Sequence, residues 1–213
     1  VGAALAGGDP RALLGALATS ADEGRIRIWS AHEDEQSVLA ASTVGGTLPV
    51  DTDAGTHVGV LINDTTGGKM DFYAHATVST AIGSCAGMPT TQVSVTWTND
   101  APADAATALP PDVTGGGNFG VDPGSTRTLL AIYGPEGATL SRADRDGDEE
   151  PVQTALLGTR SVVQHDVLLA PGESTTVTVQ FQGDGAGERI DSVVQTPTID
   201  APTATREELR CTS

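Results

Sequence analysis

The sequence contains few basic residues and few aromatic residues. Against 28 acidic residues it has 11 basic ones, which gives a net charge of −17. Such a charge repels the phosphates of nucleic acids and anionic lipid surfaces, so we expect no nucleic-acid partner. Aromatic residues make up 3% of the 213 residues and hydrophobic residues 38%. A core must therefore consist mainly of small and β-branched side chains, which favours β-sheets.

Long hydrophobic runs are also absent. No stretch is long enough to cross a bilayer, and the chain does not open with the basic and then apolar pattern of a signal peptide. We therefore expect no direct membrane insertion of this chain. Any membrane anchor is expected upstream of Val1.

Cysteine is scarce, with Cys85 and Cys211 as the two examples. In a Thr- and Gly-rich chain of extracellular character, a lone pair most simply forms one disulfide. The alternative is two unrelated buried thiols. We predict the disulfide, which would tie the C-terminal tail to the rest of the domain.

Helical patterns are confined to residues 1–56, which we interpret as a helical or mixed N-terminal region at the end of an upstream domain. Asp9-Pro10 supplies an N-cap and a first-turn proline, and the leucines that follow recur at helical spacing. A short strand is expected at 25–29. A second helix with an acidic first turn follows, and Val38 and Leu39 should face inward.

Residues 57–213 carry the alternation expected of an immunoglobulin-like antiparallel β-sandwich. After the Pro171-Gly172 turn, for example, Val177, Val179 and Phe181 alternate with polar residues and share one face of a strand. The nine strands expected from such patterns are 58–63, 72–82, 92–98, 126–133, 138–143, 152–157, 161–169, 175–182 and 190–196. The long irregular stretch 99–125 should be functional or packed as its own unit.

Two motifs resemble catalytic or cofactor signatures in spacing alone. Gly115, Gly117 and Gly120 match a dinucleotide fingerprint, but prolines flank them and no βαβ unit fits there. Cys85 has the spacing of a nucleophile elbow, but a second strand pattern follows where a helix is needed. We expect a loop and a hairpin end, respectively, and no cofactor.

The remaining candidates for metal or catalytic chemistry are weak. The four histidines, at 32, 57, 75 and 165, form no pair at helical spacing. Asp144, Asp146 and Asp148 are spaced as in a calcium loop, but Glu149 and Ala155 replace the required glycine and glutamate. Asp146-Gly147 is a strong type I′ turn signal, so we favour a hairpin there over a calcium site. No catalytic residue is predicted.

Residues 63–71 form the most concentrated polar stretch between two expected strands. One interpretation is local: the first residues cap turns, and Lys69 pairs with Asp71. The other is that this stretch meets residues 109–120, the glycine loop, to whose peptide groups Lys69 and Asp71 offer donors and acceptors. The residues of this candidate lock or partner surface are Asn63, Asp64, Lys69, Asp71, Gly115, Gly116 and Gly117.

Several motifs in order carry a family resemblance: NDTTGGKMDFY, LPPDVTGGG, FGVDPGSTRT and LLAPGESTTVTVQF. The chain resembles the C-terminal extracellular part of an uncharacterised family of actinobacterial membrane-anchored envelope proteins (domain of unknown function, family 4012). The resemblance implies a location on the extracellular face of the cell envelope, with anchoring through upstream sequence. It implies no activity.

We therefore expect a non-catalytic extracellular envelope module for assembly or protein contact, with an envelope protein or wall polymer as partner. One alternative is a glycan- or wall-polymer-binding module, although sugar platforms usually need exposed aromatics, which are scarce here. Another is a supporting domain for an envelope-polymer enzyme whose catalytic half lies upstream.

Overall fold

The computed structural model describes residues 9–52, 55–183, 189–200 and 203–211. The chain divides into two compact units, Val1–Thr47 and Leu48–Ser213. This division lies nine residues before the predicted boundary at residue 57, so the segment before the first strand belongs to the second unit.

The N-terminal unit contains helices α2 (Pro10–Asp22) and α3 (Glu33–Ala40). The predicted cap of α2 is confirmed, since the Asp9 carboxylate accepts the backbone N–H of Arg11 at 3.0 Å. No side chain of either helix is buried within the described residues. The leucine pattern of α2 therefore forms a helix without forming a core.

Two expectations for the N-terminal unit are wrong. Residues 25–29 form no strand. One backbone hydrogen bond, from the Ile28 N–H to the Val44 oxygen at 2.9 Å, joins them to the segment that follows α3. Val38 does not face inward but is 72% exposed. Helix α3 spans eight residues, none of them is buried, and Leu39 is half-buried.

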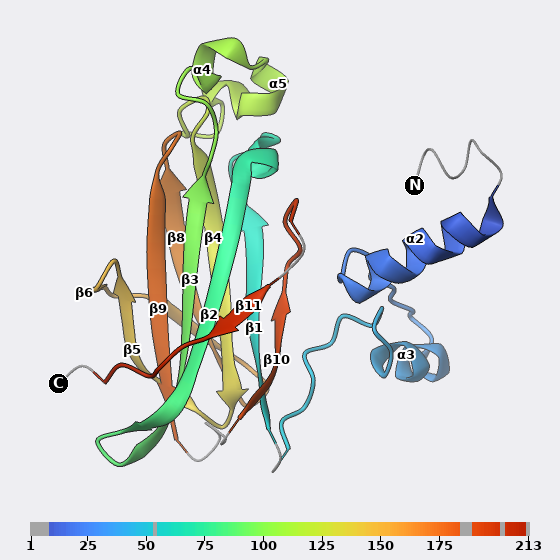
Figure 1. Cartoon of the computed structure of the whole chain (residues 1–213), viewed down its shortest axis with the longest axis vertical. Helices are drawn as coiled ribbons and strands as arrows, with labels where there is room; N and C mark the ends of the chain where they lie inside the picture. The colour runs from blue at the N-terminus through green and yellow to red at the C-terminus, as the bar shows by residue number, and fades with distance from the viewer. Residues whose placement is uncertain (1–8, 53–54, 184–188, 201–202, 212–213) are drawn as a thin grey trace. The chain divides into compact units, whose positions relative to one another are not determined.

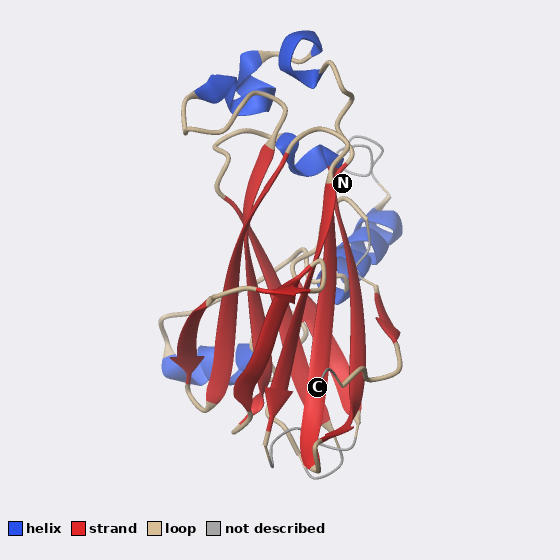
Figure 2. Cartoon of the chain, turned by 90° about the vertical axis from the view of Figure 1, so that its left-hand side faces the viewer, coloured by secondary structure: helices blue, strands red, loops and turns tan. Residues whose placement is uncertain are grey.

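The second unit is a sandwich of two β-sheets, as predicted (Figures 1 and 2). Within the described residues, one sheet has five strands in the spatial order β10 (Ile190–Gln195), β1 (Thr56–Asp64), β4 (Thr126–Glu136), β8 (Arg160–Leu169) and β7 (Gln153–Leu157). The other has six, in the order β11 (Ala204–Arg206), β2 (Ala74–Cys85), β3 (Met88–Asn99), β9 (Ser174–Gln182), β5 (Thr139–Arg145) and β6 (Asp148–Glu149).

The pairing departs from the expected antiparallel pattern at one edge of each sheet. Strand β10 runs parallel to β1, and β11 runs parallel to β2. The other strand pairs are antiparallel. Strand β2 also begins later than predicted, because Phe72 and Tyr73 belong to the 3-10 helix η1 (Met70–Tyr73).

At the opposite edge of the five-stranded sheet, β7 pairs with β8 and all five of its residues are exposed. Leu156 and Leu157 are the most prominent, with 74% and 59% of their surfaces exposed. This edge strand therefore presents apolar side chains and backbone groups to solvent.

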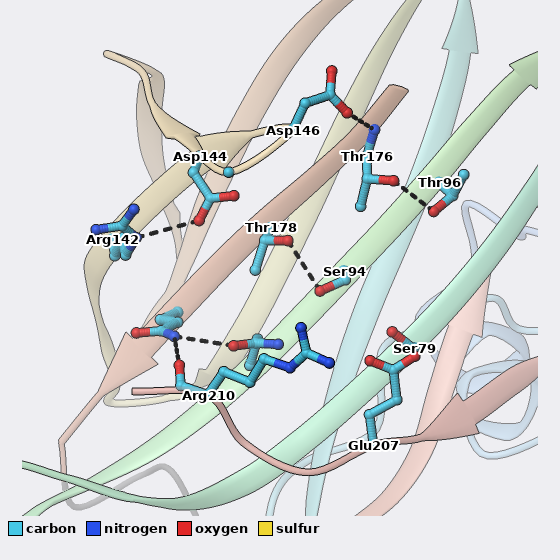
Figure 3. A pocket seen from close by; sticks show the side chains of 13 residues that line it. Ser79, Ser94, Thr96, Arg142, Asp144, Asp146, Thr176, Thr178, Glu207 and Arg210 are labelled. Carbon is cyan, nitrogen blue, oxygen red and sulfur yellow. Dashed lines mark hydrogen bonds and ion pairs between the residues drawn. The ribbon is translucent and has the colours of Figure 1, made fainter. Parts of the chain in front are cut away.

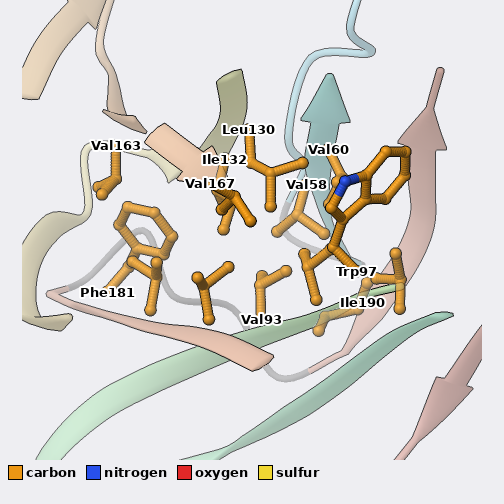
Figure 4. Packing of buried hydrophobic residues seen from close by; sticks show 14 of the residues in the cluster. Val58, Val60, Val93, Trp97, Leu130, Ile132, Val163, Val167, Phe181 and Ile190 are labelled. Carbon is orange, nitrogen blue, oxygen red and sulfur yellow. The ribbon is translucent and has the colours of Figure 1, made fainter. Parts of the chain in front are cut away.

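The core lies between the two sheets and is filled mainly by valine (Figure 4). Trp97 and Phe181 are its largest side chains, and each is at most 1% exposed. The fully buried valines around them are Val58, Val60, Val78, Val93, Val95, Val163, Val167, Val177 and Val179. The small-residue core inferred from the composition is thus confirmed.

A buried arginine closes one end of the sandwich. Arg160 is 4% exposed and donates from its guanidinium to the backbone oxygens of His57, Gly134 and Pro49 at 2.8, 3.0 and 2.6 Å. Its charge is balanced by Asp51, whose carboxylate oxygen lies 2.9 Å from Nη2. These bonds join β1, β4 and β8 to residues 49–51, which precede the first strand of the sandwich.

The C-terminal segment is bound to the six-stranded sheet. Cys85 at the end of β2 and Cys211 form the predicted disulfide, with 5.5 Å between their Cα atoms. Between β11 and this bond, the backbone N–H of Glu207 donates to Thr80 at 2.9 Å, and the Gln180 side chain donates to the Arg210 oxygen at 2.9 Å. The tail thus lies on the sheet along its length.

Asp51→Asn should lower the free energy of unfolding at neutral pH by about 1.5 to 3 kcal/mol, the range for a hydrogen bond to a charged group. Burial alone would raise the pKa of Asp51, but bonds from the Glu136 N–H and from Arg160 outweigh it and hold the pKa below its ordinary value. The stabilisation is therefore present above about pH 4 and disappears as the pH falls through the lowered pKa.

Urea denaturation at several pH values measures this difference. Asp148→Asn, which removes an exposed carboxylate of β6, is the matched control and should show no such pH-dependent gap. An equal loss in both variants, or a gap that persists at pH 2, would contradict the role of Asp51.

Replacing both cysteines by alanine should destabilise the second unit by up to about 4 to 5 kcal/mol, the chain-entropy figure for a loop of this length. The bond joins residues 126 positions apart, so its loss frees most of the unit in the unfolded state. Denaturation of oxidised protein, reduced protein and the double variant gives the comparison. Equal midpoints for all three would exclude the effect.

Candidate binding surfaces

The outer face of the six-stranded sheet carries a groove of about 500 Å³ (Figure 3). Its floor consists of the polar side chains that alternate with the buried valines on β2, β3 and β9. These floor residues are Ser79, Gln92, Ser94, Thr96, Thr176, Thr178 and Gln180.

Cross-strand hydrogen bonds order this floor. The Ser94 and Thr178 hydroxyls lie 3.1 Å apart, and those of Thr96 and Thr176 lie 2.8 Å apart. Gln180 donates to the Gln92 oxygen at 3.0 Å. The groove therefore presents hydroxyl and amide groups in fixed positions, each with further hydrogen-bonding capacity.

One wall of the groove is the hairpin of β5 and β6. The expected type I′ turn is confirmed, with φ of 53° at Asp146 and 91° at Gly147. The Asp146 carboxylate accepts the Thr175 hydroxyl at 2.7 Å and the Thr176 N–H at 2.8 Å. This carboxylate thus fixes the hairpin to β9, a role different from the calcium ligation considered above.

The other wall is the C-terminal segment that the disulfide holds. Glu207 and Arg210 line the groove, and Figure 3 shows the Arg210 side chain extending over the floor. Among the described residues, neither side chain has a hydrogen-bond or ion-pair partner. By contrast, Arg142 on the hairpin wall is already paired with Asp144 at 3.3 Å.

The groove thus offers a free guanidinium and a free carboxylate above a hydroxyl and amide floor. Such a surface can bind a polar chain through charge-assisted and neutral hydrogen bonds. Sequence patterns do not predict this groove, because the tail residues that form its wall follow no periodic pattern. For the floor, the sequence indicates only that polar residues alternate with apolar ones along the strands.

The predicted meeting of residues 63–71 with the glycine loop is confirmed. The Lys69 N–H donates to the Val113 oxygen at 2.8 Å. A Cβ added to Gly68 would lie 2.6 Å from that oxygen and 3.0 Å from the Gly115 nitrogen. The two backbones are therefore in direct contact, and a small cluster with buried Met70, Ala101 and Ala105 lies there.

The alternative, local pairing of Lys69 with Asp71 is wrong. Lys69 does not pair with Asp71; its Nζ lies 3.5 Å from Asp112, and both side chains are at least 70% exposed. Lys69 precedes η1 and Asp71 lies within it, and residues two apart in a 3-10 helix point in different directions. The contact therefore consists of backbone groups together with one exposed ion pair from Lys69 to Asp112.

The glycine loop needs glycine for its conformation. Gly115, Gly116 and Gly117 have φ of 75°, 59° and 77°, in the left-handed region. They follow helices α4 (Ala105–Ala108) and α5 (Pro111–Thr114) and form the short 3-10 helix η2 (Gly115–Gly117). The expected loop is confirmed, packed on its own small cluster. Asn63 lies in β1, opposite Leu129 of β4.

The histidines lie apart, and the described residues bring together no group of three or more His, Cys, Asp or Glu that could hold a metal ion. His57 lies 2.7 Å from the Ser192 hydroxyl, His75 lies 2.7 Å from Asp200, and His165 lies 2.6 Å from Glu150. These three histidine side chains thus each have a hydrogen-bonding partner.

Comparisons with known proteins add little. No family model and no curated protein matches the chain. The M1 zinc metallopeptidase of Deinococcus radiodurans is similar at 15% identity and a TM-score of 0.23, over 61% of this chain and 20% of that one. A mutant of that enzyme bound to a Tyr-Ser-Ala substrate gives 12% identity with the same coverage and TM-score. The chain spans about a fifth of these structures.

Two features bear on location. The confirmed disulfide is typical of proteins that mature in an oxidising compartment. Among the described residues, no helix has the length and apolar character that a membrane span requires.

Gly68→Ala should destabilise the second unit by about 1 to 3 kcal/mol, because the new methyl group overlaps the Val113 oxygen. Lys69→Ala should change the stability by less than about 0.5 kcal/mol, as expected for an exposed ion pair. Chemical denaturation midpoints of the two variants test the contact. A larger loss of stability in Lys69→Ala than in Gly68→Ala would show that the Lys69 side chain contributes more to the contact than the close backbone approach at Gly68.

Proposed function

We propose that this chain is a non-catalytic extracellular module of the cell envelope, anchored through upstream sequence, and that it serves assembly or protein contact. The observation that carries the proposal is the groove wall formed by Glu207 and Arg210, two charged side chains without partners among the described residues. Charged groups left free in a groove favour an interaction with groups of opposite charge on a partner.

The proposed partner is an envelope protein that lays a polar segment along the groove. A polypeptide supplies both carboxylate and ammonium or guanidinium groups, which complement Arg210 and Glu207. Its backbone supplies donors and acceptors for the floor hydroxyls and amides. The disulfide supports this role because it holds one groove wall in place and so limits the ordering cost of binding.

A second candidate function is binding of a glycan or wall polymer. The hydroxyl and amide floor favours it, because sugar hydroxyls pair with such groups. The absence of aromatic residues from the groove lining opposes it, since sugar rings usually pack on aromatic faces. The exposed rings of Trp29, Phe72 and Phe119 lie outside the lining.

A photo-reactive amino acid at Ser94, on the groove floor, should capture the partner in intact envelopes. The same residue placed at Leu157, on the other sheet, is the position control. A protein adduct at Ser94 supports the proposal, and an adduct of carbohydrate alone supports the second candidate. Equal adducts at both positions would reject the groove as the contact surface.

Arg210→Ala should lower the yield of the Ser94 adduct about tenfold, the effect of losing one charge-assisted hydrogen bond. Arg11→Ala removes the same charge from an exposed position on α2 and should leave the yield unchanged. Circular dichroism would confirm that both variants fold. If the two variants cross-link equally well, Arg210 does not contact the partner.

A further inference from the structure

A second, smaller pocket of about 150 Å³ lies where β1, η1 and β3 meet the segment that follows β10. It is formed by Ile62, Asp64, Asp71, Trp97, Thr196, Pro197, Thr198 and Ile199. None of these residues lines the groove on the outer sheet face. The pocket is therefore a distinct site.

Two carboxylates line this pocket, and among the described residues of its lining there is no lysine, arginine or histidine. Asp64 accepts the Thr66 N–H at 2.9 Å, whereas Asp71 has no hydrogen-bond or ion-pair partner among the described residues. Lys69, the nearest cation in the sequence, is directed to Asp112 instead. Burial raises the pKa of Asp71, and the charge of Asp64 raises it further. The pocket thus holds negative charge that no lining residue neutralises.

The rest of the lining is largely apolar, with Ile62, Pro197 and Ile199 beside the ring of Trp97. Trp97 is 1% exposed, and its indole Nε1 has no hydrogen-bond partner among the described residues. The ring therefore borders the pocket from the core side, and its N–H has no surface that a ligand in the pocket could reach.

We propose that this pocket binds a primary alkylammonium group, with an alkyl stem against Ile62, Pro197, Ile199 and Trp97 and the ammonium between Asp64 and Asp71. An ammonium donates three hydrogen bonds and neutralises the two carboxylates, and an aromatic ring favours a nearby cation. A divalent metal fits less well, because it requires many oxygen ligands and the lining is half apolar.

The test uses 4-aminobutan-1-ol, n-butylamine and butan-1-ol as probes. The chain has two tryptophans, so Trp29→Phe leaves Trp97 as the sole fluorophore for a titration. Both amines should bind with a dissociation constant on the order of 1 to 10 mM, as expected for ligands of this size. Butan-1-ol, which lacks the charge, should cause no saturable change.

Asp71→Asn should weaken amine binding at least tenfold. The same variant should raise the denaturation midpoint slightly at neutral pH, because it removes an unpaired charge that is repelled by the carboxylate of Asp64. Asp112→Asn is the matched control, since it removes a carboxylate from the neighbouring loop outside the pocket and should leave binding unchanged.

Backbone amide shifts from NMR locate the site. Saturable shifts at Ile62, Trp97 and Ile199 with the amines, lost in Asp71→Asn alone, support the proposal. Equal binding of butan-1-ol, an equal effect of Asp112→Asn, or no saturation by the amines at 100 mM would overturn it. A response to calcium chloride at lower concentration than to the amines would make the pocket a metal site and would also overturn it.

Discussion

The close packing of two sheets through small side chains is the constraint on which the rest of the second unit depends. Valine fills most of the interface, and Trp97 and Phe181 supply its bulk. A Cβ at Gly134 would lie 2.6 Å from the Phe181 ring, so even the backbone approaches the core closely there. Because strand side chains alternate, the buried valines of β3 and β9 have polar neighbours on the outer face. The groove floor therefore consists of the outward-facing residues of the same strands whose inward-facing residues form the core.

Most of the strands could be predicted because their information is local. Alternation, β-branched residues and turn signals mark β3, β8 and β9 within a few residues of their ends. Strand β11 carries no such mark, since its three residues are all exposed. It forms where the disulfide and tail contacts hold it beside β2. The parallel edge pairs could not be predicted for the same reason: the partner of an edge strand is set by distant contacts.

The candidate sites show the same difference between what local sequence indicates and what distant contacts decide. The approach of residues 63–71 to the glycine loop was predicted correctly, because both segments interrupt the strand pattern. The partners of their side chains were not, since Lys69 reaches Asp112 and Asp71 turns to a pocket with Asp64. Arg160 and Asp51 also gave no signal, because 109 residues separate them. Sequence patterns indicate which residues are buried but not which charged groups meet across the fold.

The exposed edge strand β7 has a consequence for how the protein behaves at high concentration. Its sequence, QTALL, contains none of the charges or prolines by which edge strands usually resist pairing with another chain. The protection must come from elsewhere, and the net charge of −17 provides it through long-range repulsion between copies. Colloidal stability therefore depends on ionised carboxylates spread over the whole surface. It is weakest near the isoelectric point of about 4.3, where β7 is free to template aggregation.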